Sequence, residues 1–588
     1  MLAANHPSQP LRSALPPLAT SYDEIPYPRL AFAYTHPSHL ATIGRLLGLR
    51  PAPVDRCRVL ELGCASGSNL VPMAYALPGS AWVGIDLSER QIADGREFVA
   101  GLGLTNVVVE QLDIRQAAES LADRFEPFDY IIAHGIYSWV PDTVKDALLA
   151  TCRRLLAPEG IAYVSYNCYP GGHLRDMVRR MCQYHCRRES APRAFAAKNR
   201  AFLEFLLQIL PASDDPYRAA LREQAANLLA ERDSVILHDV LERDNDPRLL
   251  HQFLADAARH GLQYLGDAHF SNMVGIGIDS AGLDLIRQRG DVIDFQQRLD
   301  FLYGRALRAT LLCREEIAVR HPIVPEAARD LWIGSGAVAV SADGSKFAAG
   351  EVDRIDVDDV SPVIFRADEC TTTIASRIGK AAMLELCAVH PKPLRFEAFV
   401  ERVRHRLASA RAATTQNATA GAPNDPSLAD QLGRMAVRWF AIRLVELSAF
   451  DPPMATEINA RPIASAVARY QVANGWSAAD PLPTEAGLPD GAADDRVAHQ
   501  VTNLLHRRIY LGGELVSRVI LQLDGKHDRT ALVESLAAPV LSGQATMHFD
   551  GQRVTDAPAV RKILFDRVEA CIDDLARNAL LVREPRIV

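Results

Sequence analysis

The sequence lacks the features that mark membrane-spanning and secreted proteins. No apolar run among its 588 residues reaches the length of a bilayer span, so we expect no transmembrane helix. Met1–Thr20 have neither a charged leader nor a continuous apolar core, which argues against a signal peptide. The ten cysteines show no framework spacing. Together these absences predict a protein of the reducing cytoplasm.

An excess of basic residues is also missing. The chain has 64 Lys and Arg against 72 Asp and Glu, a net charge of −8, and no basic patch stands out. Nucleic acid is therefore not an expected partner. Cys182, His185 and Cys186 fall on one predicted helix but would need a fourth ligand from elsewhere, so we predict no metal site.

An alternation of short apolar runs and amphipathic segments fills residues 57–167. Such alternation is typical of parallel strands joined by crossover helices, and it predicts a doubly wound, Rossmann-like α/β domain. Ser88 is an expected N-cap for a helix over Glu89–Leu102, and Pro141-Asp142 open another. The five expected strands are Arg58–Leu62, Ala81–Asp86, Asn106–Gln111, Phe128–His134 and Ile161–Tyr166.

The remaining chain is long enough for further domains. A helical stretch over about Gly172–Glu242 reads as an insert, after which a helix over Arg248–His260, Gly261 and a short strand from Leu262 would resume the sheet. Two stretches read as linkers, Ser409–Pro426 and Ser477–Asp495. We expect a cofactor-binding core at 1–185, a helical insert and regulatory region at 186–312, a middle α+β domain at 313–455, and a winged-helix-like domain at 456–588.

A glycine-containing turn joins the first strand to the next helix. Glycine lets the backbone turn sharply and approach a ligand at a helix N-terminus. Gly63 and Gly67 are four residues apart, which is not the Gly-x-Gly-x-x-Gly spacing of a dinucleotide fold. Asp86 ends the second strand, where a carboxylate can bind both hydroxyls of a ribose.

The carboxylate of Glu61 distinguishes between two possible cofactors, S-adenosylmethionine and NAD. This carboxylate would repel a pyrophosphate but attract the ammonium of a methionine moiety and favour a nearby sulfonium, which indicates S-adenosylmethionine rather than NAD. Asp113 is a candidate contact for the adenine amino group, with a helix N-cap as the structural alternative. The predicted cofactor-binding residues are Glu61, Gly63, Cys64, Ala65, Gly67, Asn69, Asp86, Leu87, Asp113, Ile114 and His134.

Aromatic residues gather after strands four and five, whose carboxyl ends should face the methyl group. The expected catalytic residues are His134, Tyr137, Trp139, Tyr166 and Asn167, which would exclude water, stack on a cation and orient or deprotonate an acceptor amine. A packed lid without chemistry is the alternative. Asp300, Arg305 and Arg308 are expected on one helix, supporting the site or the acceptor, with a solvated charged face as the alternative.

These residues occur in motifs that resemble a known family. The chain resembles bacterial class I methyltransferases followed by a methyltransferase regulatory domain, a group that includes rickettsial protein-lysine methyltransferases acting on outer-membrane proteins. The matching motifs are Tyr22–Tyr27, Thr35–Pro37, Glu61–Asn69, His134–Pro141, Tyr166–His173, His238–Glu242, Asn245–Pro247 and Asp300–Arg308, with weaker matches at Arg461–Pro462, Ala468–Gln471, Val501–Leu504 and Leu523–Gly525. Gly172 departs from the family, which has a bulky tryptophan there.

The resemblance implies a methyltransferase whose acceptor is a lysine side chain, carried by an outer-membrane or surface protein before its export. Two alternatives remain open from the residues alone. One is a methyltransferase that acts on a small metabolite or a peptide natural product. The other is a non-catalytic, cofactor-binding regulator or scaffold whose C-terminal module recruits a partner.

Overall fold

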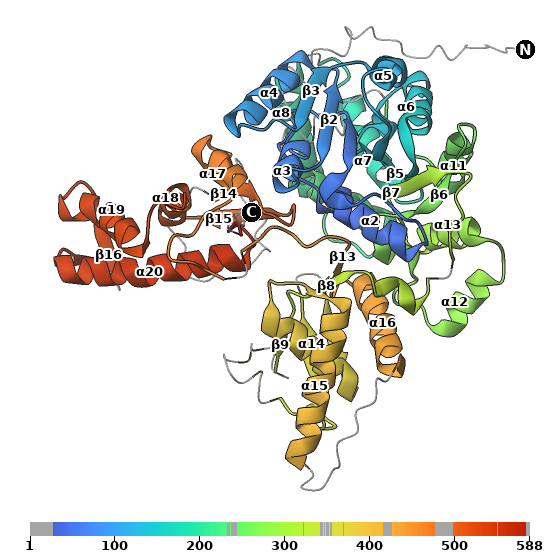
Figure 1. Ribbon diagram of the computed structural model, residues 1–588. Coiled ribbons are helices and arrows are strands. Elements are labelled where there is room, and N and C mark those ends of the chain that lie inside the picture. Colours follow the sequence, from blue (N-terminus) through green and yellow to red (C-terminus); the bar gives the residue numbers. More distant parts are fainter. Residues whose placement is uncertain are drawn as a thin grey trace, which may run out of the picture.

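A seven-stranded sheet organises the first half of the molecule (Figure 1). In this computed structural model the described residues are 27–189, 191–231, 236, 244–321, 323–341, 345, 347, 352, 355–367, 370–414, 426–455, 457–476, 498–549 and 551–583. In spatial order the strands are β3 (Val107–Gln111), β2 (Ala81–Asp86), β1 (Arg58–Leu62), β4 (Phe128–Ala133), β5 (Leu156–Asn167), β7 (Leu307–Arg314) and β6 (Leu262–Asp267).

The strand order reverses beside β1. From β1 the chain moves outward to β2 and β3, and then returns to place β4 on the other side of β1, all in parallel register. β7 runs antiparallel to both β5 and β6. In an open sheet of this kind ligands bind beyond the carboxyl ends of the strands at the reversal point, which here lies between β1 and β4.

Helices cover both faces of the sheet. The helices on one face are α2 (Pro37–Leu46), α3 (Leu70–Ala76) and α4 (Glu89–Gly101), and those on the other are α5 (Ile114–Ala122), α6 (Asp142–Leu155) and α11 (Leu250–Ala258). Ser88 caps α4 by accepting a hydrogen bond from the Gln91 backbone N–H at 3.2 Å, as predicted. The doubly wound α/β fold is thus confirmed, while β5 begins at Leu156 and includes Pro158 and Gly160, which were expected to precede the strand.

The insert consists of separate helices in the described residues. They are α7 (Gly172–His185), α8 (Pro192–Ile209) and α9 (Pro216–Leu229), and they share a small core around Val178, Leu203 and Leu221. The predicted stretch missed the break before α9, where Asp215 caps the helix and Pro216 begins it. The expected motif His238–Glu242 lies outside the described residues, as do Tyr22–Pro26 and the whole of Met1–Thr20.

Asp300, Arg305 and Arg308 do not share a helix. After α12 (Ser280–Arg287), Asp300 lies on α13 (Val292–Tyr303) and Arg308 lies on β7. The Arg308 guanidinium and the Asp300 carboxylate are fully buried, with Nε to Oδ2 at 2.8 Å, and Arg308 also contacts Asp267 at 3.1 Å. The sequence pattern predicts a charged helix here because Arg308 interrupts the apolar pattern of the strand. The three residues form an internal ion cluster, so neither the expected helix nor its solvated alternative is correct.

Two further modules follow the sheet (Figure 1). The middle module contains β8 (Trp332–Gly334), β9 (Val338–Val340), β10 (Val363–Arg366), β11 (Thr371–Ile374), α14 (Arg377–Val389), β12 (Leu394–Arg395), α15 (Phe396–Thr414), α16 (Pro426–Ala441) and β13 (Glu446–Ser448). The C-terminal module contains α17 (Ala466–Ala473), β14 (Ala498–Thr502), β15 (Arg508–Gly512), α18 (Glu514–Gln522), α19 (Arg529–Leu541), β16 (Met547–Phe549), β17 (Gln552–Val554) and α20 (Ala557–Arg577).

The predicted domain limits remain predictions. β6 and β7 pair into the first sheet, so that sheet continues beyond residue 185. Of the expected linkers, 477–495 lies outside the described residues, and so does most of 409–426, whose first residues extend α15. Within the described part of the chain, no helix combines the length and the apolarity that crossing a bilayer requires.

Candidate active site

The turn after β1 forms a tight cradle of backbone. Gly63 and Gly67 have φ of 70° and 69°, and Ala65 between them has φ of 49°. The N–H groups of Gly63 and Cys64 donate to the Ile85 carbonyl at 2.8 and 3.0 Å, which ties the turn to the end of β2. A Cβ on Gly63 would lie 2.3 Å from Cδ1 of Ile136, so this position requires glycine for both space and conformation.

The two carboxylate oxygens of Glu61 differ in their hydrogen bonding. The residue lies in β1 and is 4% exposed. Its Oε1 accepts a hydrogen bond from Nδ2 of Asn69 at 2.8 Å, whereas its buried Oε2 has no hydrogen-bond partner among the described residues. Burial raises the pKa of Glu61 to about 8, the Asn69 hydrogen bond opposes this rise, and Asp86 adds to it. A buried oxygen without a partner is a ready position for a cationic group, as the methionine ammonium would require.

Asp86 closes the other side of the turn. Its Oδ2 accepts from the Ala65 N–H and its Oδ1 accepts from the Ser88 N–H, both at 2.9 Å. The side chain is half-buried at the end of β2, and the neighbouring Leu87 is 57% exposed. The two carboxylates of Glu61 and Asp86 therefore lie at the carboxyl ends of adjacent strands, on either side of the glycine turn.

Asp113 acts as a helix cap. Its Oδ1 accepts from the Arg115 backbone N–H at 2.8 Å at the start of α5, and its carboxylate is paired with the Arg115 guanidinium. That side-chain hydrogen bond, opposed by desolvation, lowers the pKa of Asp113. Asp113 therefore forms the helix N-cap that was expected as the structural alternative. A contact between Asp113 and the adenine remains a prediction. Ile114 begins the helix and packs on the sheet core.

His134 lies directly after β4 and is held from its Nδ1 side. Nδ1 is 2.9 Å from the Tyr163 hydroxyl and 3.1 Å from the Ser165 hydroxyl, which also accepts from the Gly135 N–H at 2.8 Å. Burial lowers the pKa of His134 to about 3, with a smaller contribution from His269. The imidazole is therefore neutral at physiological pH.

Tyr137 and Tyr166 occupy the core on the α11 face of the sheet. Their exposed fractions are 0% and 2%. The Tyr137 hydroxyl donates to Asp256 at 2.9 Å, the Tyr166 hydroxyl is 3.0 Å from that of Thr310, and both rings contact Phe253. Both hydroxyls are already engaged, so their positions do not support the expected role in orienting or deprotonating an acceptor.

Alternation along β5 explains this placement. Successive strand residues point to opposite faces, so Tyr163 and Ser165 lie on the face of His134 while Tyr166 lies on the other. Asn167 is half-buried; its N–H donates to the Ser138 hydroxyl at 2.8 Å and its Nδ2 to Asn245 at 3.1 Å. Trp139 is also half-buried, in the short 3-10 turn Tyr137–Trp139.

We predict that Tyr166→Phe keeps kcat within about twofold of wild type and lowers stability by about 1 kcal/mol, the usual worth of one buried hydrogen bond. Tyr163→Phe is the matched comparison on the same strand, because its hydroxyl contacts His134; it should lower kcat more than Tyr166→Phe does. Steady-state methylation and thermal unfolding of both variants check this. A loss of about 100-fold in Tyr166→Phe would restore a chemical role for its hydroxyl.

Sequence reasoning missed an aromatic cluster on the His134 face. The Phe32 ring is 3.9 Å and the Tyr34 ring 5.9 Å from that of His134, and His269, after β6, is 4.4 Å from Tyr34. Tyr34 stacks on Tyr163 at 6.3 Å. Phe32 and Tyr34 precede the motif Thr35–Pro37, but nothing in their local pattern distinguishes them from packing residues.

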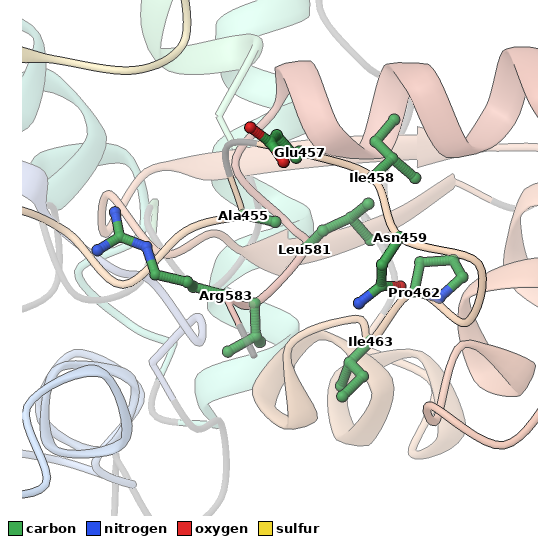
Figure 2. A pocket seen from close by; sticks show the side chains of 9 residues that line it. Ala455, Glu457, Ile458, Asn459, Pro462, Ile463, Leu581 and Arg583 are labelled. Atoms are coloured by element: carbon green, nitrogen blue, oxygen red, sulfur yellow. The ribbon is translucent and has the colours of Figure 1, made fainter. Parts of the chain in front are cut away.

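A recess of about 280 Å³ opens beside this cluster. It lies between the segment before α2 and the β14–β15 hairpin, and burial raises the pKa of the Tyr34 hydroxyl beside it to about 12. Its lining residues are Ala31, Phe32, Ala33, Tyr34, His506, Arg507, Arg508 and Tyr510. A second hollow, of about 220 Å³, lies in the C-terminal module around Asn459, Ile463 and Leu581 and shares no residue with the first (Figure 2).

Gly172, the departure from the family motif, begins α7. A Cβ there would lie 3.3 Å from the Pro247 side chain and 3.4 Å from the Tyr169 ring. The space beside Gly172 is therefore filled by Pro247 and Tyr169, and a larger residue would have to displace them.

Three family matches cover much of the chain. Residues 53–202 match a methyltransferase domain, 232–314 a predicted methyltransferase regulatory domain, and 492–580 the PKMT C-terminal winged helix domain. The chain is similar to two uncharacterized proteins of Rickettsia prowazekii. RP789 is 28% identical, over 95% of this chain and 93% of its own length, and RP028 is 36% identical, over 42% of this chain and 96% of its own length.

Solved structures give the same result in three dimensions. PKMT2 from Rickettsia typhi superposes with a TM-score of 0.77 at 26% identity, over 95% of this chain and all of the other. Its complex with AdoHcy, S-adenosylhomocysteine, superposes with a TM-score of 0.76 over the same shares. The winged-helix character predicted for the C-terminal module agrees with these matches.

Proposed function

Because this chain belongs to the family of bacterial S-adenosylmethionine-dependent methyltransferases in which a class I domain is followed by a methyltransferase regulatory domain, we propose that its acceptor is a lysine side chain of a protein. The activity itself, methyl transfer from S-adenosylmethionine, follows from the methyltransferase domain and the AdoHcy-bound structural relative. The single observation that favours lysine is the likeness to PKMT2, whose abbreviation denotes a protein lysine methyltransferase, over 95% of this chain.

We propose that Glu61 and Asp86 hold the two ends of the cofactor. When bound, S-adenosylmethionine supplies a methyl group activated by a sulfonium. Oε2 of Glu61 would accept from the methionine ammonium, and Asp86 would accept from the ribose hydroxyls. The backbone of Gly63–Gly67 would lie against the ligand between them, with Cys64, Asn69 and Leu87 around it. Asp113, Ile114 and His134 complete the proposed set beside the adenine and the methyl group.

On the acceptor side we propose the His134 face in place of Tyr137 and Tyr166. A lysine must lose its proton before it attacks, and an apolar, aromatic surrounding favours the neutral amine. Phe32, Tyr34 and Tyr163 supply such surroundings and can face a cationic amine or sulfonium. His134 is neutral and can take part in a hydrogen bond with the acceptor amine. Asn167 and Trp139 remain candidates for positioning the acceptor.

This proposal is tested by incubating the pure protein with methyl-labelled S-adenosylmethionine and a fractionated bacterial lysate. We expect label in the protein fraction, and methylated lysine after acid hydrolysis. A lysate whose amines have been acetylated is the matched control and should accept no label. Label confined to small molecules would instead support the metabolite alternative, and label on another amino acid would contradict lysine.

The raised pKa of Glu61 predicts a pH-dependent affinity for the cofactor. Below about pH 8 the free carboxyl is protonated, and binding of an ammonium requires its ionised form, so binding must release a proton. The affinity for S-adenosylhomocysteine should rise by up to about tenfold per pH unit between pH 6 and 8 and then level off. Calorimetric titration across this range checks it, and an affinity that is independent of pH would mean that no ionised Glu61 is needed.

A further inference from the structure

The side chain of His506 brings the C-terminal module into contact with the cofactor turn. His506 lies in the turn between β14 and β15, is 2% exposed, and has its Nε2 at 2.8 Å from Oδ1 of Asn69. Its φ is 58°, in the left-handed region. Asn503 fixes the turn, because its Oδ1 accepts from the N–H groups of Leu505 and Arg507 at 3.0 and 2.8 Å. The imidazole is thus held in place by the hairpin that carries it.

The neighbours of Asn69 fix the direction of each hydrogen bond. The Phe32 N–H donates to Oδ1 of Asn69 at 2.9 Å, so this atom is an acceptor and the amide nitrogen must face Glu61. Nε2 of His506 must therefore carry a hydrogen and donate to the same oxygen. Nδ1 of His506 is then bare, and it has no hydrogen-bond partner among the described residues. Burial lowers the pKa of His506 well below its usual value, in keeping with a neutral ring.

These contacts form a continuous series of hydrogen bonds from His506 in the C-terminal module to Glu61 in β1. His506 holds the oxygen of Asn69, and the nitrogen of Asn69 holds Oε1 of Glu61 at 2.8 Å. With Oε1 held in this way, Oε2 of Glu61 faces the cofactor turn without a hydrogen-bond partner in the described part of the chain. A buried side chain whose position depends on such a chain changes its geometry when a link is removed.

We propose that His506 is a positioning residue for the cofactor site, through which the C-terminal module completes the binding site for the methionine end of S-adenosylmethionine. This inference rests on the proposed role of Glu61. It gives the winged-helix module a part in cofactor binding, in addition to any contact it makes with the acceptor. His506 does not touch the cofactor; it orients the amide that orients the carboxylate.

The test compares three substitutions of His506 in the full-length protein. His506→Ala should weaken S-adenosylhomocysteine binding about tenfold, the scale of one buried hydrogen bond. His506→Gln places an amide nitrogen near the position of Nε2 and should restore most of the affinity. His506→Asn places the amide nitrogen near Nδ1, for which the described residues offer no hydrogen-bond partner, and should not restore the affinity, although Asn tolerates the left-handed backbone better. The matched control is His548→Ala, at an exposed position of β16.

The outcomes separate a hydrogen-bonding role from a structural one. If His506 only shaped the turn, His506→Asn would bind as well as or better than His506→Gln, and the inference would be wrong. It would also be wrong if His506→Ala bound like His548→Ala while Glu61→Gln lost affinity. If Glu61→Gln bound S-adenosylhomocysteine like wild type, the proposed contact between Glu61 and the cofactor would be wrong, and the inference about His506 would be wrong with it. In an Asn69→Ala background, the further substitution His506→Ala should lower the affinity for S-adenosylhomocysteine by less than about twofold, because the hydrogen bond from Asn69 to Glu61 is already absent.

Discussion

Replacing Glu61 by Gln is expected to weaken S-adenosylhomocysteine binding about 100-fold while leaving the unliganded protein at least as stable as wild type. The loss of affinity follows because Gln offers a neutral amide to an ammonium that Oε2 of Glu61 would pair with in a buried, charge-assisted contact. Glu119→Gln, at an exposed position of α5, is the control and should bind normally.

The expected effect on stability has the opposite sign. Burial raises the pKa of Glu61 from 4.5 in the unfolded chain to about 8. Stability from this carboxyl is therefore present below about pH 4.5 and is lost as the pH rises toward 8, where the buried group must ionise. Gln carries no charge to desolvate, so the variant's Tm at pH 8 should equal or exceed that of wild type. A variant with lower Tm and lower affinity together would indicate that Glu61 is a structural residue.

Replacing Arg308 by Leu is expected to cost about 3 to 5 kcal/mol of stability, because the buried Asp267 would lose its Arg308 partner and the buried Asp300 would keep only Arg305. Arg308 bonds both oxygens of Asp300 at 2.8 Å and one of Asp267 at 3.1 Å, and burial raises the pKa of Asp300. Urea unfolding measures the loss. Arg577→Leu, which removes an exposed pair on α20, should change stability by less than about 1 kcal/mol.

A second variant isolates the charge. In an Asp300→Asn background the Arg308→Leu substitution leaves one buried carboxylate instead of two, so its cost should be smaller than in the wild-type background. Equal costs in both backgrounds would contradict the assignment of Arg308 to an internal ion cluster. Because the ends of β5, β6 and β7 meet there, we expect the same variants to affect the fold more than cofactor affinity.

The sheet could be predicted from sequence where each strand is a short apolar run between clear breaks. Arg58–Leu62 and Ala81–Asp86 end where the expected turns begin, and the structure gives the same limits. β7 was missed because Arg308 interrupts its apolar pattern, and its charge is compensated by residues on other elements. Compensation of this kind depends on tertiary contacts that periodicity does not contain.

The cofactor turn was accessible to sequence reasoning because its parts are local. Glu61 and the glycines are within one short segment, and Asp86 closes the next strand. The acceptor side was harder. The sequence places Tyr166 and Asn167 at the end of a strand but does not say which face of the sheet each occupies. A shift of one residue along the strand moves a side chain from the core face to the face that borders the site. The predicted roles of Asn167, Trp139 and His134 therefore remain predictions.

Contacts between distant segments left no local signal. His506 and Asn69 are 437 positions apart, and the Phe32 N–H reaches the same amide from 37 positions away. Each of these residues resembles an ordinary packing or turn residue in its own neighbourhood. Only the folded chain shows that the segment before α2, the turn after β1 and the β14–β15 hairpin meet at one side chain.

We propose that Glu61 and Asp86 hold opposite ends of the same cofactor. Calorimetric titration with S-adenosylhomocysteine and with 5′-methylthioadenosine, which lacks the amino-acid end, tests it directly in wild type, Glu61→Gln and Asp86→Asn. We predict that Glu61→Gln weakens S-adenosylhomocysteine binding but leaves methylthioadenosine affinity within about twofold of wild type, whereas Asp86→Asn weakens both at least tenfold. Equal losses for both ligands in Glu61→Gln, or unchanged binding of either ligand in Asp86→Asn, would show that the two carboxylates do not hold opposite ends of the cofactor.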